Sequence, residues 1–251
     1  MTTEASTGLE AYWQAAETIL ERVRETQAEP IRRAARLCAD CIEEDGIVHT
    51  FGSGHSRGFA MELVHRAGGL APINRLDFDD LALYAGWPLA RVKSLECERD
   101  LEAGKVLLTC HQLEKQDIFL IASQSGVNAA IVELALQIEE RGHSLIAVTS
   151  LDHSQRTPAR HPSGKKLYDL ADLLIENLGP FGDTVLDIPN GRVCSTSSLS
   201  GALIAQMLNA EIVSALLADG VEPPVFLSDN IPGGIERNLL LQKRYEQRVR
   251  W

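Results

Sequence analysis

The stretch DIFLIASQSG, residues 117–126, decides the fold, because a strand ends within it and a helix begins after it. Its first six residues start at an acidic side chain and then stay apolar, which is typical of a strand buried on both faces of a parallel sheet. Residues 127–141 place apolar side chains at helical spacing and end before Gly142. The sequence therefore predicts a strand-loop-helix unit of an α/β protein.

The loop of this unit, Ser123-Gln124-Ser125-Gly126, offers two hydroxyls, an amide and a glycine at the start of a helix. Free backbone N–H groups and the positive end of the helix dipole favour an anion at such a position. The pattern is that of a phosphate cradle, but a helix N-cap with spare serines has the same residues. This loop by itself leaves both interpretations open.

Strands and helices alternate along the rest of the chain. This spacing predicts β-α-β units, a parallel sheet and helices on both of its faces. Loops that follow different strands then meet at one edge of the sheet, so residues 52–56 and 123–126 should be neighbours. There is no composition break and no internal repeat, which predicts one globular unit. The predicted strands are 46–51, 71–78, 117–122, 144–149, 171–176 and 184–188, and the predicted helices are 9–28, 30–44, 57–67, 94–113, 127–141, 199–217 and 236–250.

Two further junctions carry hydroxyl groups. Gly52-Ser53-Gly54-His55-Ser56 follows the first strand, and Ser195-Thr196-Ser197-Ser198 precedes a long apolar helix. The first begins like a dinucleotide fingerprint, but Arg57 stands where the third glycine should be, which removes most of that case. Four hydroxyl residues at one helix start exceed what a single N-cap needs. The three junctions together favour a site for an oxyanion and a polyol.

The composition argues against several function classes. A formal net charge of −11 over 251 residues argues against non-specific binding of nucleic acid. The chain shows no signal-peptide pattern and no apolar run long enough for a membrane helix, so we expect a cytoplasmic protein without a membrane partner. The five cysteines are odd in number and scattered, which indicates a reduced protein without a disulfide framework.

Metal and cofactor sites are not expected. Cys38 and Cys41 form a C-x-x-C pair within a predicted helix, but no second pair is nearby, so core thiols are the favoured interpretation. The seven histidines show no H-x-x-x-H pattern and no close cluster. Residues 153–166 contain His153, His161 and two arginines, which we interpret as a solvated basic loop; a lid over the site or a subunit contact is the alternative.

Six motifs follow one another along most of the chain: Phe51–Ser56, Arg66–Pro72, Ser123–Ala129, Ala147–Leu151, His161–Lys165 and Gly233–Asn238. In order and coverage they resemble the SIS (sugar isomerase) phosphosugar-binding family, in its stand-alone, poorly characterised branch related to the phosphoheptose isomerases. The resemblance implies a three-layer α/β/α sandwich with a five-stranded parallel sheet, the SIS fold, over residues 46–251. The helical spacing of residues 9–28, and Pro30 at the start of a second helix, predict in addition an N-terminal helical pair within residues 1–45 that packs on this domain or at an oligomer interface. A homodimer or homotetramer is expected.

The resemblance also implies which residues hold the ligand. Its phosphate-binding hydroxyls match Ser123, Ser125, Thr196 and Ser197, with backbone N–H groups of residues 126 and 127 assisting. Two positions depart from the pattern, because Gln124 stands where this branch usually carries Asn, and Ser195 where Pro is common. The full set of predicted phosphosugar-binding residues is Gly52, Ser53, Gly54, Ser56, Ser123, Gln124, Ser125, Gly126, Ser195, Thr196, Ser197 and Ser198.

Catalytic candidates lie close to the first loop. Aldose–ketose isomerisation needs a base that moves a proton between adjacent carbons through an enediol, and an acid–base group for the oxygens. Glu62 lies near the region where phosphoheptose isomerases of this family place a catalytic Glu, although the spacing from the glycine loop is shorter here. His55, and His65 on the predicted helical face of Glu62, are the partner candidates. Each has a structural alternative, namely an exposed acid on a helix or a histidine bonded to backbone.

We therefore expect a phosphosugar-binding protein, and an isomerase acting by proton transfer without a cofactor is the leading hypothesis. One alternative is a non-catalytic sensor that binds a sugar phosphate and signals through its oligomeric state, because fold does not determine function. Another is a sugar-phosphate etherase or deaminase that works through a similar enolised intermediate. No nucleic acid is expected among the partners.

Overall fold

The computed structural model describes residues 7–250 and contains a five-stranded, fully parallel sheet. The strand order is β2-β1-β3-β4-β5, so the chain adds β2 on one side of β1 and the later strands on the other. The order therefore changes direction between β1 and β3. The strands are β1 (Val48–Gly52), β2 (Ile73–Arg75), β3 (Ile118–Ala122), β4 (Ser144–Thr149) and β5 (Leu173–Glu176).

The central strand β3 is apolar because helices cover both of its faces. Leu120 and Ala122 belong to one hydrophobic cluster, whereas Phe119 and Ile121 belong to the cluster on the other face. Successive residues of a strand point to opposite faces, so each residue of such a strand must be apolar. All five residues of β3 are buried, which confirms the prediction of a buried strand at this position.

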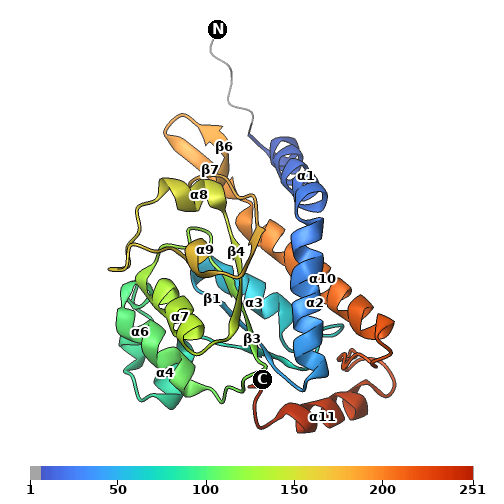
Figure 1. Ribbon diagram of the computed structural model, residues 1–251. Coiled ribbons are helices and arrows are strands. Elements are labelled where there is room, and N and C mark those ends of the chain that lie inside the picture. Colours follow the sequence, from blue (N-terminus) through green and yellow to red (C-terminus); the bar gives the residue numbers. More distant parts are fainter. Residues whose placement is uncertain (1–6, 251) are drawn as a thin grey trace.

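Helices on both faces complete a three-layer α/β/α sandwich, which confirms the predicted fold class (Figure 1). α2, α3 and α10 pack on one face of the sheet, and α4, α6 and α7 pack on the other. The packed helices are α2 (Ala28–Glu43), α3 (Arg57–Leu63), α4 (Asp79–Tyr84), α6 (Leu101–Leu107), α7 (Ala129–Glu140) and α10 (Ser197–Ala218). The remaining helical segments are α1 (Leu9–Thr26), η1 (Gly54–Ser56), α5 (Leu89–Val92), α8 (Leu151–Arg156), α9 (Leu167–Leu170) and α11 (Gly234–Tyr245).

The N-terminal helices α1 and α2 form the predicted helical pair, and α1 extends along the line of α2 (Figure 1). Pro30 lies in the first turn of α2, where its missing N–H has no intrahelical partner to lose. Ile31 and Cys38 of α2 are buried in the same cluster as the residues of β1 and β3. Residues 1–6 of the predicted segment lie outside the described residues. A role for the pair at an oligomer interface stays a prediction.

The predicted helix 57–67 is shorter in the structure. α3 ends at Leu63, Val64 is extended, and His65 has a φ of 48°, in the left-handed region. A right-handed helix cannot continue through such a residue. The prediction of one helix over 57–67 is therefore wrong in its last four residues.

The predicted helix 94–113 is broken into short segments, η2 (Cys97–Arg99), α6 and η3 (Leu108–Cys110). Asp100 causes the first break, because its backbone is extended and its carboxylate accepts a hydrogen bond from the Glu102 N–H at 3.0 Å, which caps α6. α6 then packs closely on α7, so that a Cβ on Gly104 would lie 2.4 Å from the carbonyl oxygen of Ala130. Tertiary contact therefore decides where this helix runs.

The predicted strand 184–188 forms, but outside the parallel sheet. β6 (Thr184–Ile188) pairs antiparallel with β7 (Gly191–Ser195), which the sequence did not predict. Pro189 and Asn190 connect the two strands, and both residue types are common in turns. The hairpin projects beyond the sheet near α8 and leads directly into α10 (Figure 1), so it positions the start of that helix.

The long helix α10 is mostly apolar, and polar residues such as Gln206 and Glu211 are scattered along it. Its residues Ile204, Leu208 and Ile212 are fully buried in the cluster shared with α2 and α3. Within residues 7–250, α10 is the one helix that is long and apolar enough to cross a membrane. This is weak evidence, because a core helix meets the same criteria of length and composition.

The last helix, α11, ends at Tyr245 and is shorter than the predicted helix 236–250. The following residues run along the N-terminal edge of the sheet. Arg248 donates to both carboxylate oxygens of Asp117 at 2.6 and 2.5 Å, and the Arg250 N–H donates to the side-chain oxygen of Asn74 at 3.0 Å. Beyond α11 the chain keeps the backbone hydrogen bond from the Val249 N–H to the Tyr245 carbonyl at 2.8 Å, and these side-chain and backbone contacts anchor it to the edge of the sheet.

Candidate functional site

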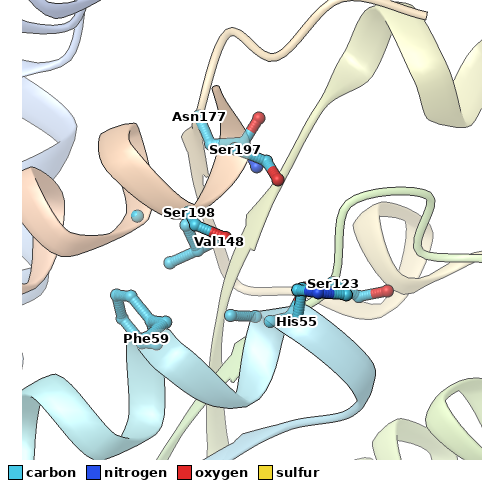
Figure 2. A pocket seen from close by; sticks show the side chains of 10 residues that line it. His55, Phe59, Ser123, Val148, Asn177, Ser197 and Ser198 are labelled. Carbon is cyan, nitrogen blue, oxygen red and sulfur yellow. The ribbon is translucent and has the colours of Figure 1, made fainter. Parts of the chain in front are cut away.

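A pocket lies at the C-terminal edge of the sheet, where the strand order changes direction between β1 and β3. In open α/β sheets, ligands bind outside the carboxyl ends of the strands at such a point. The loops after β1 and β3 and the start of α10 meet there (Figure 2). The lining of this crevice pocket consists of His55, Ser56, Phe59, Ala122, Ser123, Val148, Asn177, Ser197, Ser198 and Gly201.

The crevice pocket brings together residues from all three predicted hydroxyl-bearing junctions. Ser56, Ser123 and Ser198 represent the first, second and third junction in its lining. In the parallel pairing of β1 with β3, Gly52 lies opposite Ala122, which confirms that the first two loops are neighbours. Contacts of these hydroxyls with a ligand stay predictions.

The two glycines of the first loop serve its backbone geometry. A Cβ on Gly52 would lie 2.2 Å from the carbonyl oxygen of Ser56, so the tight turn into η1 admits no larger residue. Gly54 has a φ of 54°, which favours glycine. Ser53 and both glycines line a second hollow on the β2 side of the loop. The first loop therefore borders two hollows at the same edge of the sheet.

Charged residues surround this second hollow, and most of them are paired. Arg57 Nε lies 2.6 Å from Asp77 Oδ2, and Lys93 Nζ lies 2.6 Å from Asp79 Oδ1. Burial raises the pKa of Asp77, whereas the hydrogen bond from Lys93 lowers the pKa of Asp79. Glu98 also lines the hollow and makes no ion pair with another described residue. It is the carboxylate of this hollow without a cation beside it.

Within the second loop, a serine hydroxyl accepts a hydrogen bond from a backbone N–H of the same loop. The Gly126 N–H donates to Ser123 Oγ at 3.1 Å, and Gly126 has a φ of 63°. This N–H is therefore already used, which corrects the expectation that it assists an anion. The N–H groups of Ser125 and Val127 make no hydrogen bond with any residue that the structure describes. They and the Ser125 hydroxyl are the open donors of this loop.

Gln124 connects three loops of the C-terminal edge. Its Oε1 accepts from Asn177 Nδ2 at 2.7 Å, and its carbonyl oxygen accepts from the Ser150 N–H at 3.3 Å. A Cβ on Gly179 would lie 2.4 Å from Gln124 Nε2, so a larger residue at position 179 would displace the end of this side chain. The structure therefore gives Gln124 a role in joining the loops after β3, β4 and β5, and its predicted contact with a sugar stays a prediction.

At the third junction, a carboxylate of the same chain already bonds some of the predicted ligand-binding groups. The N–H and Oγ of Ser197 donate to the two carboxylate oxygens of Asp183 at 3.0 and 2.5 Å. A carboxylate thus occupies the helix start, where an anion is favoured. Thr196 is fully buried, and its Oγ1 has no partner within residues 7–250. Ser195 is exposed at the end of β7, where its carbonyl accepts from Tyr12 Oη at 2.9 Å, and it does not line the crevice pocket.

The three catalytic candidates are not brought together. His55 lies on η1 and lines the crevice pocket. Glu62 does not line it, and its Oε1 accepts a hydrogen bond from Gln206 Nε2 of α10 at 2.8 Å. His65 lies beyond the end of α3 beside Gln242, so the prediction that it shares a helical face with Glu62 is wrong. Catalytic roles of all three residues stay predictions.

Side chains of helix α8 contact Phe181, two residues before Asp183. Asp152 Oδ2 accepts from the Phe181 N–H at 2.8 Å, and the ring of His153 lies 5.2 Å from that of Phe181. Burial lowers the pKa of His153, while the nearby carboxylates of Asp183 and Asp152 oppose this effect. The neutral imidazole is therefore the favoured form of His153.

Within residues 7–250, no group of three or more His, Cys, Asp or Glu side chains could hold a metal ion. Cys38 and Cys41 are buried on α2. Burial raises the pKa of both thiols, that of Cys41 to about 12. Since the thiolate is the form that binds metals and reacts, burial makes both cysteines inert members of the core.

Sequence patterns assigned no role to four polar residues around the loops. Asn177 follows β5, so the rule that strand ends share one edge could have found it. Asn128 stands in one of the quoted motifs and precedes α7 as its N-cap residue. Glu98 and Asp183 lie in irregular segments, where no periodicity indicates which groups they meet.

Comparisons with known proteins point to one family. A family model described as the SIS domain matches residues 11–150. A UPF0309 protein of Caldanaerobacter subterraneus subsp. tengcongensis is 42% identical over 236 residues, which cover 92% of this chain and 94% of that protein. A UPF0309 protein of Listeria monocytogenes is 39% identical over 240 residues, which cover 95% of this chain and 97% of that protein.

Solved structures share the fold at low sequence identity. The phosphoheptose isomerase of Neisseria gonorrhoeae has a TM-score of 0.54 and 19% identity, and the match covers 82% of this chain and 96% of that one. The phosphoheptose isomerase of Francisella tularensis has a TM-score of 0.52 and 16% identity, with coverage of 81% and 95%. A protein of Escherichia coli CFT073 in complex with A5P has a TM-score of 0.50 and 19% identity, with coverage of 80% and 87%. At these identities the likeness is one of fold.

Proposed function

We propose a function from one premise: this chain belongs to the SIS domain family. Our proposal is that it binds a phosphorylated sugar in the crevice pocket and isomerises it between aldose and ketose forms. The phosphate group would lie at the second loop, and the sugar would extend toward His55 and the first loop. SIS domains are sugar isomerase domains, and the structural neighbours include two phosphoheptose isomerases and a protein in complex with A5P, which supports this class of ligand.

The observation that carries the proposal is the set of open hydrogen-bond donors at one edge of the sheet. The hydroxyl of Ser125 and the N–H groups of Ser125 and Val127 have no partner among the described residues. Buried or half-buried donors are normally satisfied, so donors left open at a strand-to-helix junction suit an anion. Ser56 and Ser198 line the adjoining pocket, where hydroxyl groups can bind the hydroxyls of a sugar.

The proposed reaction is a proton transfer between neighbouring carbons. A base removes the proton from carbon 2 of the aldose, which leaves an enediol, and the proton returns to carbon 1 to give the ketose. A second proton moves between the two oxygens in the same sequence. We assign His55 to this proton transfer because it lines the pocket, and we keep Glu62 as the predicted base.

A thermal-shift screen with phosphorylated aldoses and ketoses tests the binding proposal. A ligand at 100 times its dissociation constant adds about 2.7 kcal/mol to the free energy of unfolding, which the melting temperature reports. We expect Ser125→Ala to abolish most of this ligand-dependent shift. Ser214→Ala, at an exposed position late in α10, is the matched control and should leave the shift unchanged. Equal shifts in both variants would place the phosphate elsewhere.

Exchange of the carbon-bound proton with deuterium from solvent tests the isomerase proposal. The wild type should incorporate deuterium into the sugar phosphate that it binds, and His55→Gln should bind the same compound with little exchange. Binding without exchange in the wild type would contradict the isomerase and support a non-catalytic sugar-phosphate sensor. One observation favours this rival, because Glu62 and His65 do not line the pocket that contains His55.

A further inference from the structure

Arg160 reaches the start of α7 from the loop between α8 and α9. Its Nη1 donates to the side-chain oxygen of Asn128 at 2.6 Å. Asn128 is the N-cap residue of α7 and follows the second loop by two positions. The side-chain nitrogen of Asn128 donates to Glu98 Oε2 at 2.7 Å. The amide of Asn128 is thus held between a guanidinium and a carboxylate beside the open donors of Ser125.

The position of this guanidinium is electrostatically unfavourable without an anion. The helix dipole places positive charge at the start of α7, so a cation there is repelled. Arg160 also makes no ion pair with a described residue, whereas Arg156 of the same region lies 2.7 Å from Asp152 Oδ1. A bound anion would remove both the repulsion and the lack of an ion pair. The carboxylate of Glu98, at the other end of the Asn128 amide, offsets part of the repulsion but makes no ion pair with Arg160.

The loop that carries Arg160 is firmly attached to α7. His161, the next residue, is buried, and its two ring nitrogens lie 2.9 Å from Glu133 Oε2 on α7 and 2.7 Å from Ser163 Oγ. At the end of the loop, the Leu167 N–H donates to the carbonyl oxygen of Gly126 at 2.8 Å. The loop is therefore tied both to α7 and to the second loop itself. These attachments hold Arg160 at the start of α7 and argue against a freely solvated basic loop.

We propose that Arg160 is a phosphate-binding residue of this site, and that Asn128 positions it. This inference rests on the proposed function, and it adds a charge requirement. Backbone N–H groups and serine hydroxyls can donate hydrogen bonds to many oxyanions. An added guanidinium favours a dianionic phosphate monoester over singly charged or neutral groups. The substrate class is then a phosphate monoester of a sugar, bound by Ser125, the N–H groups of the second loop and Arg160.

Titration calorimetry with inorganic phosphate at low salt tests this proposal on the full chain. We expect Arg160→Gln to weaken phosphate binding about tenfold, as the loss of one charge-assisted contact would. Arg160→Lys should recover part of the loss, because it restores the charge but not the planar fork. Arg156→Gln is the matched control, since it removes the same charge from the same region, and it should change binding less than about twofold.

The outcomes separate this inference from the proposed function. If Ser125→Ala weakens phosphate binding and Arg160→Gln matches Arg156→Gln, Arg160 is not a ligand, while the proposed function stands. If the wild type binds neither inorganic phosphate nor any phosphorylated sugar, both are overturned. Arg160 is exposed, so its variants should keep the melting temperature and circular dichroism of the wild type. A loss of binding in a folded Arg160→Gln protein, with normal binding in Arg156→Gln, supports the proposal.

Discussion

The two edges of the parallel sheet differ in how completely their polar groups are hydrogen-bonded. At the N-terminal edge, Asp117 accepts from the backbone N–H groups of Ile47 and Glu114 at 2.8 and 2.7 Å, and from Arg248 at 2.5 Å. At the C-terminal edge, the fully buried Thr196 Oγ1 has no partner among the described residues. Both edges belong to one sheet, so the strands alone do not cause this difference.

Two histidines extend the hydrogen-bond network around Asp117 at the N-terminal edge. The Asn74 amide nitrogen lies 3.0 Å from His49 Nδ1 and 3.2 Å from His111 Nδ1. The Nε2 atoms of the same rings lie 3.3 Å from Asp117 and 3.0 Å from Asp80. Each ring can accept at Nδ1 and donate at Nε2, which is what a neutral imidazole provides. Both imidazoles, the Asn74 amide and the Asp117 carboxylate have partners, as expected of groups that hold a fold together, whereas Arg248 Nε and Arg250 Nη1 beside them have none among the described residues.

The difference between the two edges suggests which residues stabilise the fold and which are available to bind a ligand. A buried polar atom without a partner costs about 1–3 kcal/mol, so the open Thr196 Oγ1 and the open donors of Ser125 and Val127 at the C-terminal edge have a reason other than stability. A ligand that supplies the missing partners is such a reason. We therefore expect substitutions at the N-terminal edge to change mainly stability, and substitutions at the open donors of the C-terminal edge to change mainly binding.

The largest expected effect is the destabilisation caused by Asp117→Asn. Asp117 is fully buried as a side chain, and Arg248 is 14% exposed, so the variant leaves a nearly buried guanidinium with only the exposed Glu114 carboxylate at 3.3 Å. Breaking a buried pair from one side costs about 3–5 kcal/mol. Denaturant unfolding measures this loss. Asp219→Asn, which removes the exposed carboxylate paired with Arg36, is the control and should cost less than about 1 kcal/mol. Similar losses in the two variants would contradict the comparison.

The second expected effect is a loss of stability in acid in two stages. Burial lowers the pKa of His49, so the unfolded state binds its proton first, and stability falls as the pH drops below about 6.5. Burial would raise the pKa of Asp117, but hydrogen bonds from His49, the Glu114 N–H, Arg248 and the Ile47 N–H lower it to about 2. The Asp117 carboxylate therefore contributes about 2 kcal/mol to the free energy of unfolding above about pH 4. This contribution is lost as the pH falls from about 4 to 2.

Denaturant unfolding at a series of pH values measures both stages. In His49→Gln the slope of stability against pH between about 6.5 and 5 should flatten, because one group that binds a proton on unfolding is gone. The stage near pH 3 should remain in that variant. A slope identical to that of the wild type would show that His49 does not stay neutral in the fold.

The smallest expected effect concerns Ser197, whose hydroxyl at the C-terminal edge already has Asp183 as a partner. Ser197→Ala removes the hydrogen bond to Asp183 and should cost about 1 kcal/mol, as the loss of a helix cap does. If Asp183 is the only partner of this hydroxyl, ligand-induced shifts in melting temperature should match those of the wild type. Weaker ligand binding in this variant would support the predicted role of Ser197 as a phosphosugar ligand.

Much of the site could be predicted because it follows from a rule about whole strands. The carboxyl ends of parallel strands lie at one edge, so Ser56, Ser123 and Ser198 could be placed together from their positions after strands or before a helix. The partners of those residues could not be predicted. The contact between Asp183 and Ser197, and that between Arg160 and Asn128, depend on the paths of irregular loops. Periodicity reports local burial and carries no information about such paths.

Sequence alone therefore determined the class of this protein: short strands rich in apolar residues, helices between them, and glycine and serine at the junctions. Those features are local, because each depends on the period of one element or on the conformational freedom of one residue. Tertiary structure decided which donors stay open. The Gly126 N–H is bonded to Ser123 Oγ and Ser197 is bonded to Asp183, whereas the N–H and hydroxyl of Ser125 have no partner among the described residues. Long-range packing brings such groups together, and it alone determines which of them remain available to a ligand.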